Sequence, residues 1–361
     1  MEAMEPWLSF PLLLLYAIAI VGNILILLIV KKEPSLHQLM YYFLSLLSVS
    51  DLGVSFSTLP TVLAALCFWA WVIAFNVCLA QMFFIHLFSW TESGILLAMS
   101  FDHYVAICNP LHYATVLTNA RIVAMGLCTV LWSFALIPVF PLLLHRLPFC
   151  HPQNILSHAY CLHVDMIKLA CTDVSINSHY RLSIVLFTFG LDSALILLSY
   201  ILIFLSVLAI ASPGECLKTL NTCVSHVLAV LIFYMPMVSV SIVHHFGAGL
   251  PHAVHTLMSL IYLFVPPMLN PIIYSIKTKE IQHRLLKILF RVRSWLVLEA
   301  LKDLMLGAES FGYPKRRGSL WRMLVLPFTC YDQTCSILGQ FLPGPYWVLS
   351  SNQLYQCSLE T

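Results

Sequence analysis

The sequence predicts an all-α membrane protein: a seven-transmembrane helix bundle with a short amphipathic helix after the seventh span. Its composition is the first observation, because 60% of the 361 residues are hydrophobic and only 9% are charged. A soluble domain carries about 25% charged residues. The second observation is a series of seven apolar stretches, each near the length of about 20 residues that crosses a bilayer. We therefore expect most of the chain to be surrounded by membrane lipid.

The apolar stretches follow one another with short polar turns between most of them. They lie at Trp7–Val30, Met40–Leu66, Val77–Tyr104, Arg121–Leu144, Ile176–Ile210, Leu220–Phe246 and Ala253–Ile276. The longest connection, His145–Ser175, joins the fourth and fifth stretches. Residues 1–290 are therefore predicted to form one domain that contains the whole bundle.

Basic residues near the ends of the spans predict the orientation, since Lys and Arg favour the cytoplasmic side of a membrane. If the N-terminus is extracellular, the inner side holds Lys31, Lys32, Arg121, Lys218, Lys277, Lys279, Arg284, Lys287, Arg291 and Arg293. The outer side then holds Arg146, Lys168 and Arg181. This bias predicts a multi-pass protein of the cell membrane with an extracellular N-terminus and a cytoplasmic C-terminus.

The residues after the seventh span differ from the bundle. Lys277–Phe290 alternates basic and apolar residues at helical spacing, which predicts an amphipathic helix along the inner membrane face. Residues 291–361 are predicted to be a cytoplasmic extension, either disordered or membrane-peripheral, because Pro314 and the Pro343-Gly344-Pro345 run interrupt any helix.

Several functional classes are disfavoured. A net charge of +2 gives no case for nucleic-acid binding. An intramembrane hydrolase needs a nucleophile–base pair or a metal motif, and neither His-Glu-x-x-His nor Gly-x-Ser-x-Gly occurs. A transporter stays as a weaker alternative, although the sequence lacks the internal repeat that many transporters have.

Motifs along the chain resemble those of one receptor family. They are LHQLMYYFL at Leu36–Leu44, MSFDHYVAICNPLHY at Met99–Tyr113, LKTLNTCVSH at Leu217–His226 and PPMLNPIIY at Pro266–Tyr274, with LSVSD at Leu47–Asp51 in the second span. In this order they resemble the odorant (olfactory) receptors, a branch of the rhodopsin-like G-protein-coupled receptors. The long fourth connection resembles the class I (fish-like) subgroup, which implies small polar or acidic odorants, no enzymatic activity, and a stimulatory G protein that raises cyclic AMP.

The resemblance also implies pairing of the outward cysteines. The family pattern joins Cys78 to Cys161 and closes the long loop on itself through Cys150 and Cys171. Because the loop is predicted to face an oxidising compartment, disulfides are expected there.

Acidic residues inside the apolar spans predict a polar site. Each charge at Asp51 and Glu92 costs about 2.5–3.5 kcal/mol in a membrane, which indicates a partner inside the bundle. In the fold that the resemblance implies, both converge with Asn270. Oxygen ligands suit a hard cation such as sodium, so Asp51 and Glu92 either hold a sodium ion or share a proton. Apart from this sodium ion, no cofactor is expected.

A ligand site is predicted at the outer side of the bundle. His86 and Ser89 lie on one face of the third span. Other polar residues expected there are His163, Arg181, Ser241 and His245. Such donors above an apolar cavity suit a small ligand with a carboxylate or carbonyl group, and histidine predicts pH sensitivity. The alternative is that these histidines are interfacial residues at helix ends.

The signalling residues contain one departure from the family. Its Asp-Arg-Tyr motif appears as Asp102, His103 and Tyr104, and the family's tyrosine switches and Asn-Pro pair are matched by Tyr200, Asn270, Pro271 and Tyr274. The resemblance implies that the missing Arg contacts the G protein. Histidine is shorter and has fewer donors. The alternative function is therefore a receptor-shaped protein with weak or no coupling.

Overall fold

The computed structural model describes residues 6–36, 38–67, 72–149, 156, 160–210, 213–246, 251–291, 293–294, 346–350 and 353–357. For some of these, including residues 213–222, 244–246 and both strands, only the backbone is described. The chain divides into two compact units, Met1–Gln282 and His283–Thr361.

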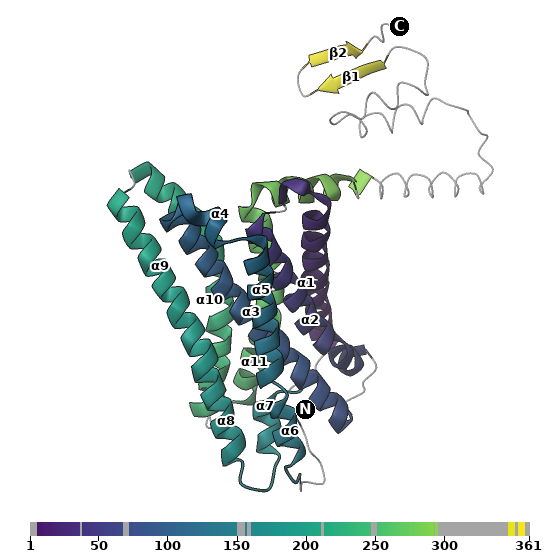
Figure 1. The fold of residues 1–361 in the computed structure, drawn as a ribbon. Coiled ribbons are helices and arrows are strands. Elements are labelled where there is room, and N and C mark those ends of the chain that lie inside the picture. The colour runs from purple at the N-terminus through teal and green to yellow at the C-terminus, as the bar shows by residue number, and fades with distance from the viewer. Residues whose placement is uncertain are drawn as a thin grey trace, which may run out of the picture. The chain divides into compact units, whose positions relative to one another are not determined.

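Seven helical spans build the first unit, as the sequence predicts (Figure 1). They are α1 (Pro6–Lys32), α2 (Leu39–Cys67), α3 (Phe75–Cys108), α5 (Asn119–Leu136) with α6 (Val139–His145), α8 (Ser175–Val185) with α9 (Leu191–Ile210), α10 (Pro213–Phe246) and α11 (His252–Lys277). Short helices complete the unit: η1 (Pro34–Leu36), η2 (Pro110–His112), α4 (Tyr113–Val116) and α7 (His163–Lys168). The predicted fold class is confirmed.

Two spans are interrupted where the sequence predicted continuous helices. The fourth divides between α5 and α6 at Ile137 and Pro138; proline has no N–H to donate, so it disturbs the helical hydrogen bonds. The fifth contains a single π-helical turn, η3 (Leu186–Gly190), between α8 and α9. The sixth helix, α10, begins at Pro213, ahead of the predicted Leu220.

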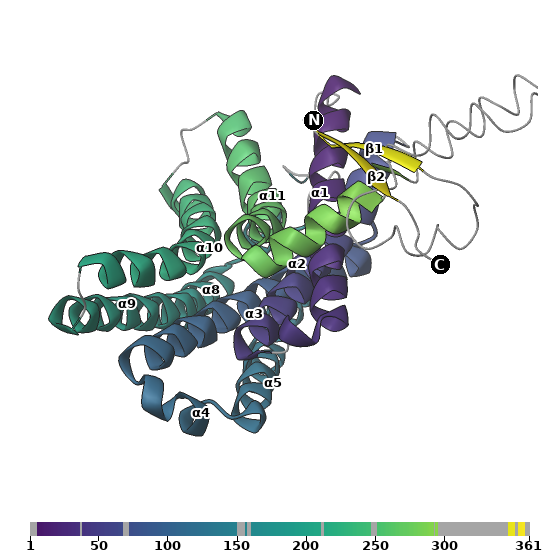
Figure 2. The same cartoon turned by 90° about the horizontal axis from the view of Figure 1, so that it is seen from above.

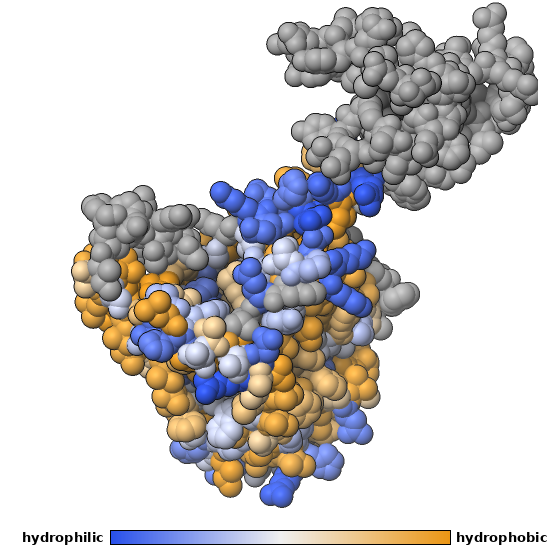
Figure 3. All heavy atoms as spheres, turned by 45° about the horizontal axis from the view of Figure 1, so that its top comes forward, coloured by the Kyte–Doolittle hydropathy of each residue, from blue (hydrophilic) through white to orange (hydrophobic). Residues whose placement is uncertain are grey.

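Helix α3 lies at the centre of the bundle (Figure 2). It packs against α2, α5, α6, α9 and α10 and is buried along most of its length. The outer faces of the other spans carry exposed large apolar residues, among them Leu131, Phe134, Leu197 and Phe204, and the sides of the unit are mostly apolar (Figure 3). Such sides are suited to contact with lipid.

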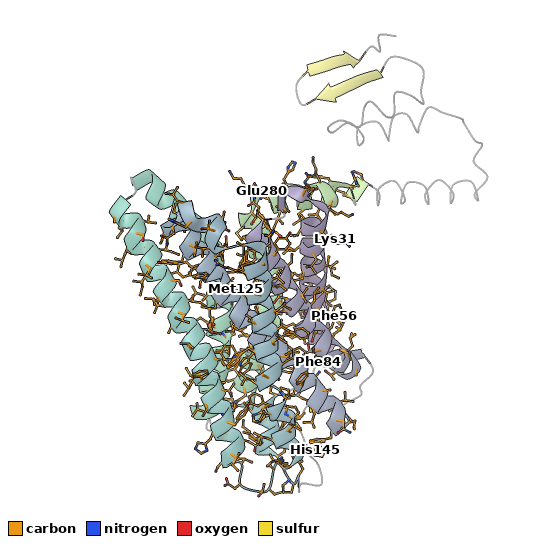
Figure 4. All side chains as sticks on the ribbon, viewed as in Figure 1. Lys31, Phe56, Phe84, Met125, His145 and Glu280 are labelled. Carbon is orange, nitrogen blue, oxygen red and sulfur yellow. A yellow bond between two sulfur atoms is a disulfide. The ribbon has the colours of Figure 1, made fainter. Side chains whose placement is uncertain are left out.

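The two ends of the bundle are named here by residues labelled in Figure 4. Lys31 and Glu280 lie at one end and His145 lies at the other. Helix α3 begins at the His145 end, where the rings of Phe75 and His145 are 6.4 Å apart. It therefore brings Cys78 to the His145 end and Asp102 to the Lys31 end.

A further helix covers residues 279–291 after α11. It begins in the first unit, where Ile281 is fully buried, and it agrees with the predicted short helix. In the second unit, β1 (Tyr346–Ser350) pairs antiparallel with β2 (Gln353–Cys357). The rest of the predicted extension, residues 292, 295–345, 351–352 and 358–361, lies outside the described residues, and the domain boundary at residue 290 stays a prediction.

Close packing of α3 against α5 generates the first testable prediction. A Cβ atom added at Gly94 would lie 2.6 Å from Cγ2 of Thr129. Gly94→Ala is therefore expected to lower the free energy of unfolding by about 1–3 kcal/mol through overpacking. Thermal unfolding of the detergent-solubilised protein measures this, and Thr129→Ser in the same chain should restore part of the loss by removing that methyl group. Equal stability of Gly94→Ala and wild type would contradict the close contact.

Candidate functional site

Three groups of polar side chains lie along α3, in different environments. The first surrounds a cavity at the His145 end, the second is enclosed in the middle of the bundle, and the third lies at the Lys31 end. Because lipid offers no hydrogen bonds, buried polar groups in a membrane need partners inside the protein. Whether they have such partners separates a structural cluster from a binding site.

A disulfide holds the long connection over the His145 end. Cys78, at the start of α3, is bonded to Cys161, with their Cα atoms 5.5 Å apart. This confirms the first predicted pair. Cys171 is also disulfide-bonded, but Cys150 lies outside the described residues, so the pairing of Cys150 with Cys171 stays a prediction.

Beneath this connection lies a cavity of about 70 Å³. Its polar lining residues are His86, Trp90, His163, Arg181, Ser241 and Tyr262, and the others are apolar. The structure thus brings together four predicted ligand residues from α3, α7, α8 and α10. The fifth, Ser89, is not part of the lining; its hydroxyl lies 3.0 Å from that of Tyr262. The sixth, His245, belongs to α10, but its side chain is outside the described part.

Many polar atoms around this cavity have no hydrogen-bond partner among the described residues. They are both ring nitrogens of His86, both of His163, Nε1 of Trp90 and Nε of Arg181. Unsatisfied buried groups are rare in folded proteins, and each one needs an explanation such as a ligand or water. The arrangement is therefore suited to binding a molecule rich in hydrogen-bond acceptors.

His163 does not have the pKa near neutral pH that the predicted pH sensitivity of the ligand site requires. Burial, together with the nearby His86 and Arg181, lowers the pKa of His163 to about 3. His163 is therefore neutral at physiological pH, and the predicted pH sensitivity does not apply to it. The positive charge at the cavity comes from Arg181, whose guanidinium stays protonated near neutral pH.

The middle cluster joins the two acids that the sequence singles out. The Nδ2 atom of Asn270, on α11, lies 3.2 Å from Oδ2 of Asp51 and 3.1 Å from Oε1 of Glu92. All three side chains are buried. The predicted convergence is present, and one amide group donates to both carboxyl groups.

Both predicted alternatives for this cluster, a shared proton and a sodium ion, stay predictions. The amide presents its NH₂ group, a donor, whereas a cation needs oxygen ligands. Asn23 donates to the carbonyl groups of Ala19 and Pro267. Two buried carboxylates that both carried charge would also repel each other strongly.

A neighbouring network was not predicted as a unit. Ser93 of α3 donates to Oδ2 of Asp192 on α9 at 2.7 Å, and its oxygen lies 2.8 Å from the hydroxyl of Tyr234 on α10. Three helices therefore meet at one serine. An acid in an apolar stretch was the available signal for Asp192, but periodicity alone does not identify its partners.

The third group contains the altered motif. Tyr113 donates to Oδ1 of Asp102 at 2.8 Å, and Oδ2 of Asp102 lies 3.7 Å from Nδ1 of His103. The ring of His103 meets that of His226 on α10 edge to face, with centroids 5.2 Å apart. Tyr200 on α9 is hydrogen-bonded to Nδ1 of His226. His226 is the last residue of the LKTLNTCVSH motif, but the sequence pattern does not show that it is the partner of His103.

The remaining switch residues lie near these groups. Tyr104 packs against the buried cluster of Ile203, Val207 and Cys223. Pro271 lies against Gly22 of α1, where an added Cβ atom would be 3.0 Å away. Tyr274 is buried, and among the described residues its hydroxyl has no hydrogen-bond partner.

The middle cluster generates a prediction about stability. Asn270→Ala removes the donor that Asp51 and Glu92 share, so the free energy of unfolding is expected to fall by about 1–3 kcal/mol. Thermal unfolding checks this, with Ser239→Ala on the exposed face of α10 as the control. Glu92→Gln added to Asn270→Ala should recover stability. Sodium and potassium buffers should give wild type the same midpoint; a rise specific to sodium that Asp51→Asn abolishes would instead establish an ion site.

Comparisons with known proteins agree with the motifs and the seven spans. The family model described as "Olfactory receptor" matches residues 12–292. Olfactory receptor 51I2 of Homo sapiens is 57% identical over 293 residues, covering 81% of this chain and 94% of the relative. Olfactory receptor 51I1 of Homo sapiens is 57% identical over 281 residues, covering 78% and 89%. Olfactory receptor 51G1 of Homo sapiens is 52% identical over 287 residues, covering 80% and 89%. The chain therefore belongs to the olfactory receptor family of G-protein-coupled receptors, in the class I group of the 51 receptors, and is not an enzyme.

Proposed function

We propose that this olfactory receptor binds small odorants carrying a carboxylate, or failing that a polar carbonyl group, in the cavity beneath Cys161. The observation that carries the proposal is the set of buried donors without partners, on His86, Trp90, His163 and Arg181. A carboxylate offers about four lone-pair sites and a negative charge that complements the guanidinium of Arg181.

The other lining residues support a small ligand with an apolar body. Leu162, Val164, Val185, Phe189 and Met237 contribute apolar surface to a cavity of about 70 Å³. Among the described lining residues there is no Asp or Glu, so a cationic amine would meet Arg181 without a counter-charge. Short-chain acids are the ligands that this lining favours.

The proposed ligand class generates the third prediction. Arg181→Gln removes the charge that faces a carboxylate, so the potency of a straight-chain acid is expected to fall about tenfold or more, corresponding to a charge-assisted hydrogen bond of about 1.5–3 kcal/mol. The potency of the primary alcohol of equal length should change much less. Cyclic-AMP dose–response curves at matched surface expression measure both.

Lys168→Gln is the matched control for that experiment. Lys168 is also basic and lies on α7, but its side chain is half exposed and is paired with Asp165 rather than lining the cavity. It should leave both potencies near wild type. If only large apolar odorants activate the receptor, and Arg181→Gln leaves their potency unchanged, the ligand class is wrong.

We infer a topology and a partner for the other end of the bundle. With the N-terminus extracellular, the cavity opens toward the outside, and the Lys31 end meets a stimulatory G protein that raises cyclic AMP. The bias of Lys and Arg toward that end supports this orientation. The helix at residues 279–291 carries basic residues suited to an anionic inner leaflet.

The second candidate function is that of a receptor that binds its odorant but couples weakly to a G protein. The observation that favours it is the presence of His103 in the Asp102–Tyr104 motif. The side chain of His103 is largely buried and lies between Asp102 and His226. Its imidazole is shorter than an arginine and makes fewer hydrogen bonds. A receptor that binds its odorant but signals poorly is the expected result.

The fourth prediction tests this coupling end. His103→Arg is expected to raise the cyclic-AMP response about tenfold or more at equal surface expression, because a charge-assisted contact of about 1.5–3 kcal/mol becomes available. His112→Arg is the matched control: it adds the same group in the exposed η2 turn and should have little effect. An unchanged response of His103→Arg at matched surface levels would show that the exchange has been compensated elsewhere.

A further inference from the structure

The chain segment that closes the cavity, residues 160–163, is held to the helices at three points; it is called the cover segment below. The Cys78–Cys161 disulfide is the first. The hydroxyl group of Tyr160 donates to the carbonyl oxygen of Ser259 on α11 at 2.6 Å. The third is the backbone N–H of Cys161, which donates to Oε1 of Gln81 at 2.8 Å.

Both the oxygen and the nitrogen of the Gln81 amide group form hydrogen bonds in this arrangement. It lies one turn after Cys78 on α3 and is 5% exposed. Its Nε2 atom donates to the carbonyl oxygen of Ser57 at 2.9 Å and to Oγ1 of Thr61 at 2.7 Å, both on α2. A backbone N–H can only donate and a carbonyl oxygen can only accept, so these partners determine how the amide is oriented. One side chain of α3 therefore connects α2 to the cover segment.

The contact at Cys161 has a geometric consequence for the cavity. The disulfide fixes the sulfur atom of Cys161 but leaves the direction of the main chain free to rotate about that attachment. A hydrogen bond to the N–H of the same residue adds a second constraint. Leu162 and His163, the next two residues, both line the cavity. Their placement therefore depends on two attachments at one fully buried residue.

We propose that Gln81 is a positioning residue for ligand binding: its amide holds the cover segment so that His163 stays over the cavity. Gln81 is not part of the cavity lining, so it acts through His163 rather than by touching the ligand. The statement about ligand binding rests on the proposed function, whereas the statement about the cover segment does not. The two are therefore tested separately.

Hydrogen exchange of the full-length receptor in detergent tests the cover segment without any ligand. Gln81→Leu leaves the N–H of Cys161 without its acceptor, so peptides covering residues 160–163 should exchange about tenfold faster or more than in wild type. Thr61→Val is the matched control: it removes one contact of the amide on α2 but leaves the bond to Cys161, so exchange should stay near wild type. Gln81→Met serves as the second variant if Gln81→Leu does not fold. Wild-type exchange in both Gln81 variants would overturn the proposal.

A double-substitution cycle tests the consequence for binding. With the most potent straight-chain acid as the probe, Gln81→Leu should lower potency about tenfold at matched surface expression. In a His163→Ala background the same substitution should have little further effect, because the lost placement is that of His163. Additive losses would indicate a general structural role and would overturn the positioning role. If no acid activates wild type, the proposed ligand class fails, and hydrogen exchange alone still decides whether Gln81 holds the cover segment.

Discussion

The structure depends on satisfying polar groups inside a bundle that is surrounded by lipid. Lipid offers no hydrogen bonds, so a buried polar side chain needs a partner within the protein. Among the described residues, helix α3 carries more buried polar side chains than any other helix, and its central place lets it reach α2, α9, α10 and α11. Ser93 joins α3 to α9 and α10, and Asn270 joins Asp51 of α2 to Glu92 of α3. The polar contacts thus determine which helix faces pack together.

The hydrogen bonding of these polar groups also distinguishes the cavity from the middle cluster. The middle cluster is closed, since the amide of Asn270 reaches both carboxyl groups. Around the cavity the opposite holds: among the described residues, donors on His86, Trp90, His163 and Arg181 have no partner in the protein. An unsatisfied buried donor is destabilising unless something binds it. The cavity therefore has a stability cost that a ligand with acceptor atoms would offset.

The sequence could predict the spans and much of the candidate site. It could not predict contacts between side chains on different helices, and both results have physical reasons. Apolar runs identify the membrane helices because length and hydropathy are local properties of the chain. The resemblance to known receptors supplied the Cys78–Cys161 bond and the meeting of Asp51 with Glu92. Periodicity, by contrast, gives the face of a residue on its own helix but not the residue opposite. The contacts of His103 with His226, and of Gln81 with Cys161, depend on helix packing and were missed. Burial likewise lowers the pKa of His163, which no sequence pattern shows.

The proposed ligand cavity and the Asp102–His103 group lie toward opposite ends of α3, so the identity of residue 103 bears on one of them only. The cavity lies at the His145 end, and none of its lining residues belongs to the Asp102–His103 group. The contacts of His103 are with Asp102 and His226, and neither residue lines the cavity or belongs to the middle cluster. At the Lys31 end, His103 brings two imidazole rings into contact, one from α3 and one from α10. Both rings are small and aromatic, so their contact packs the two helices together. The place of residue 103 in the fold therefore depends on packing between rings, and its role in coupling stays a proposal.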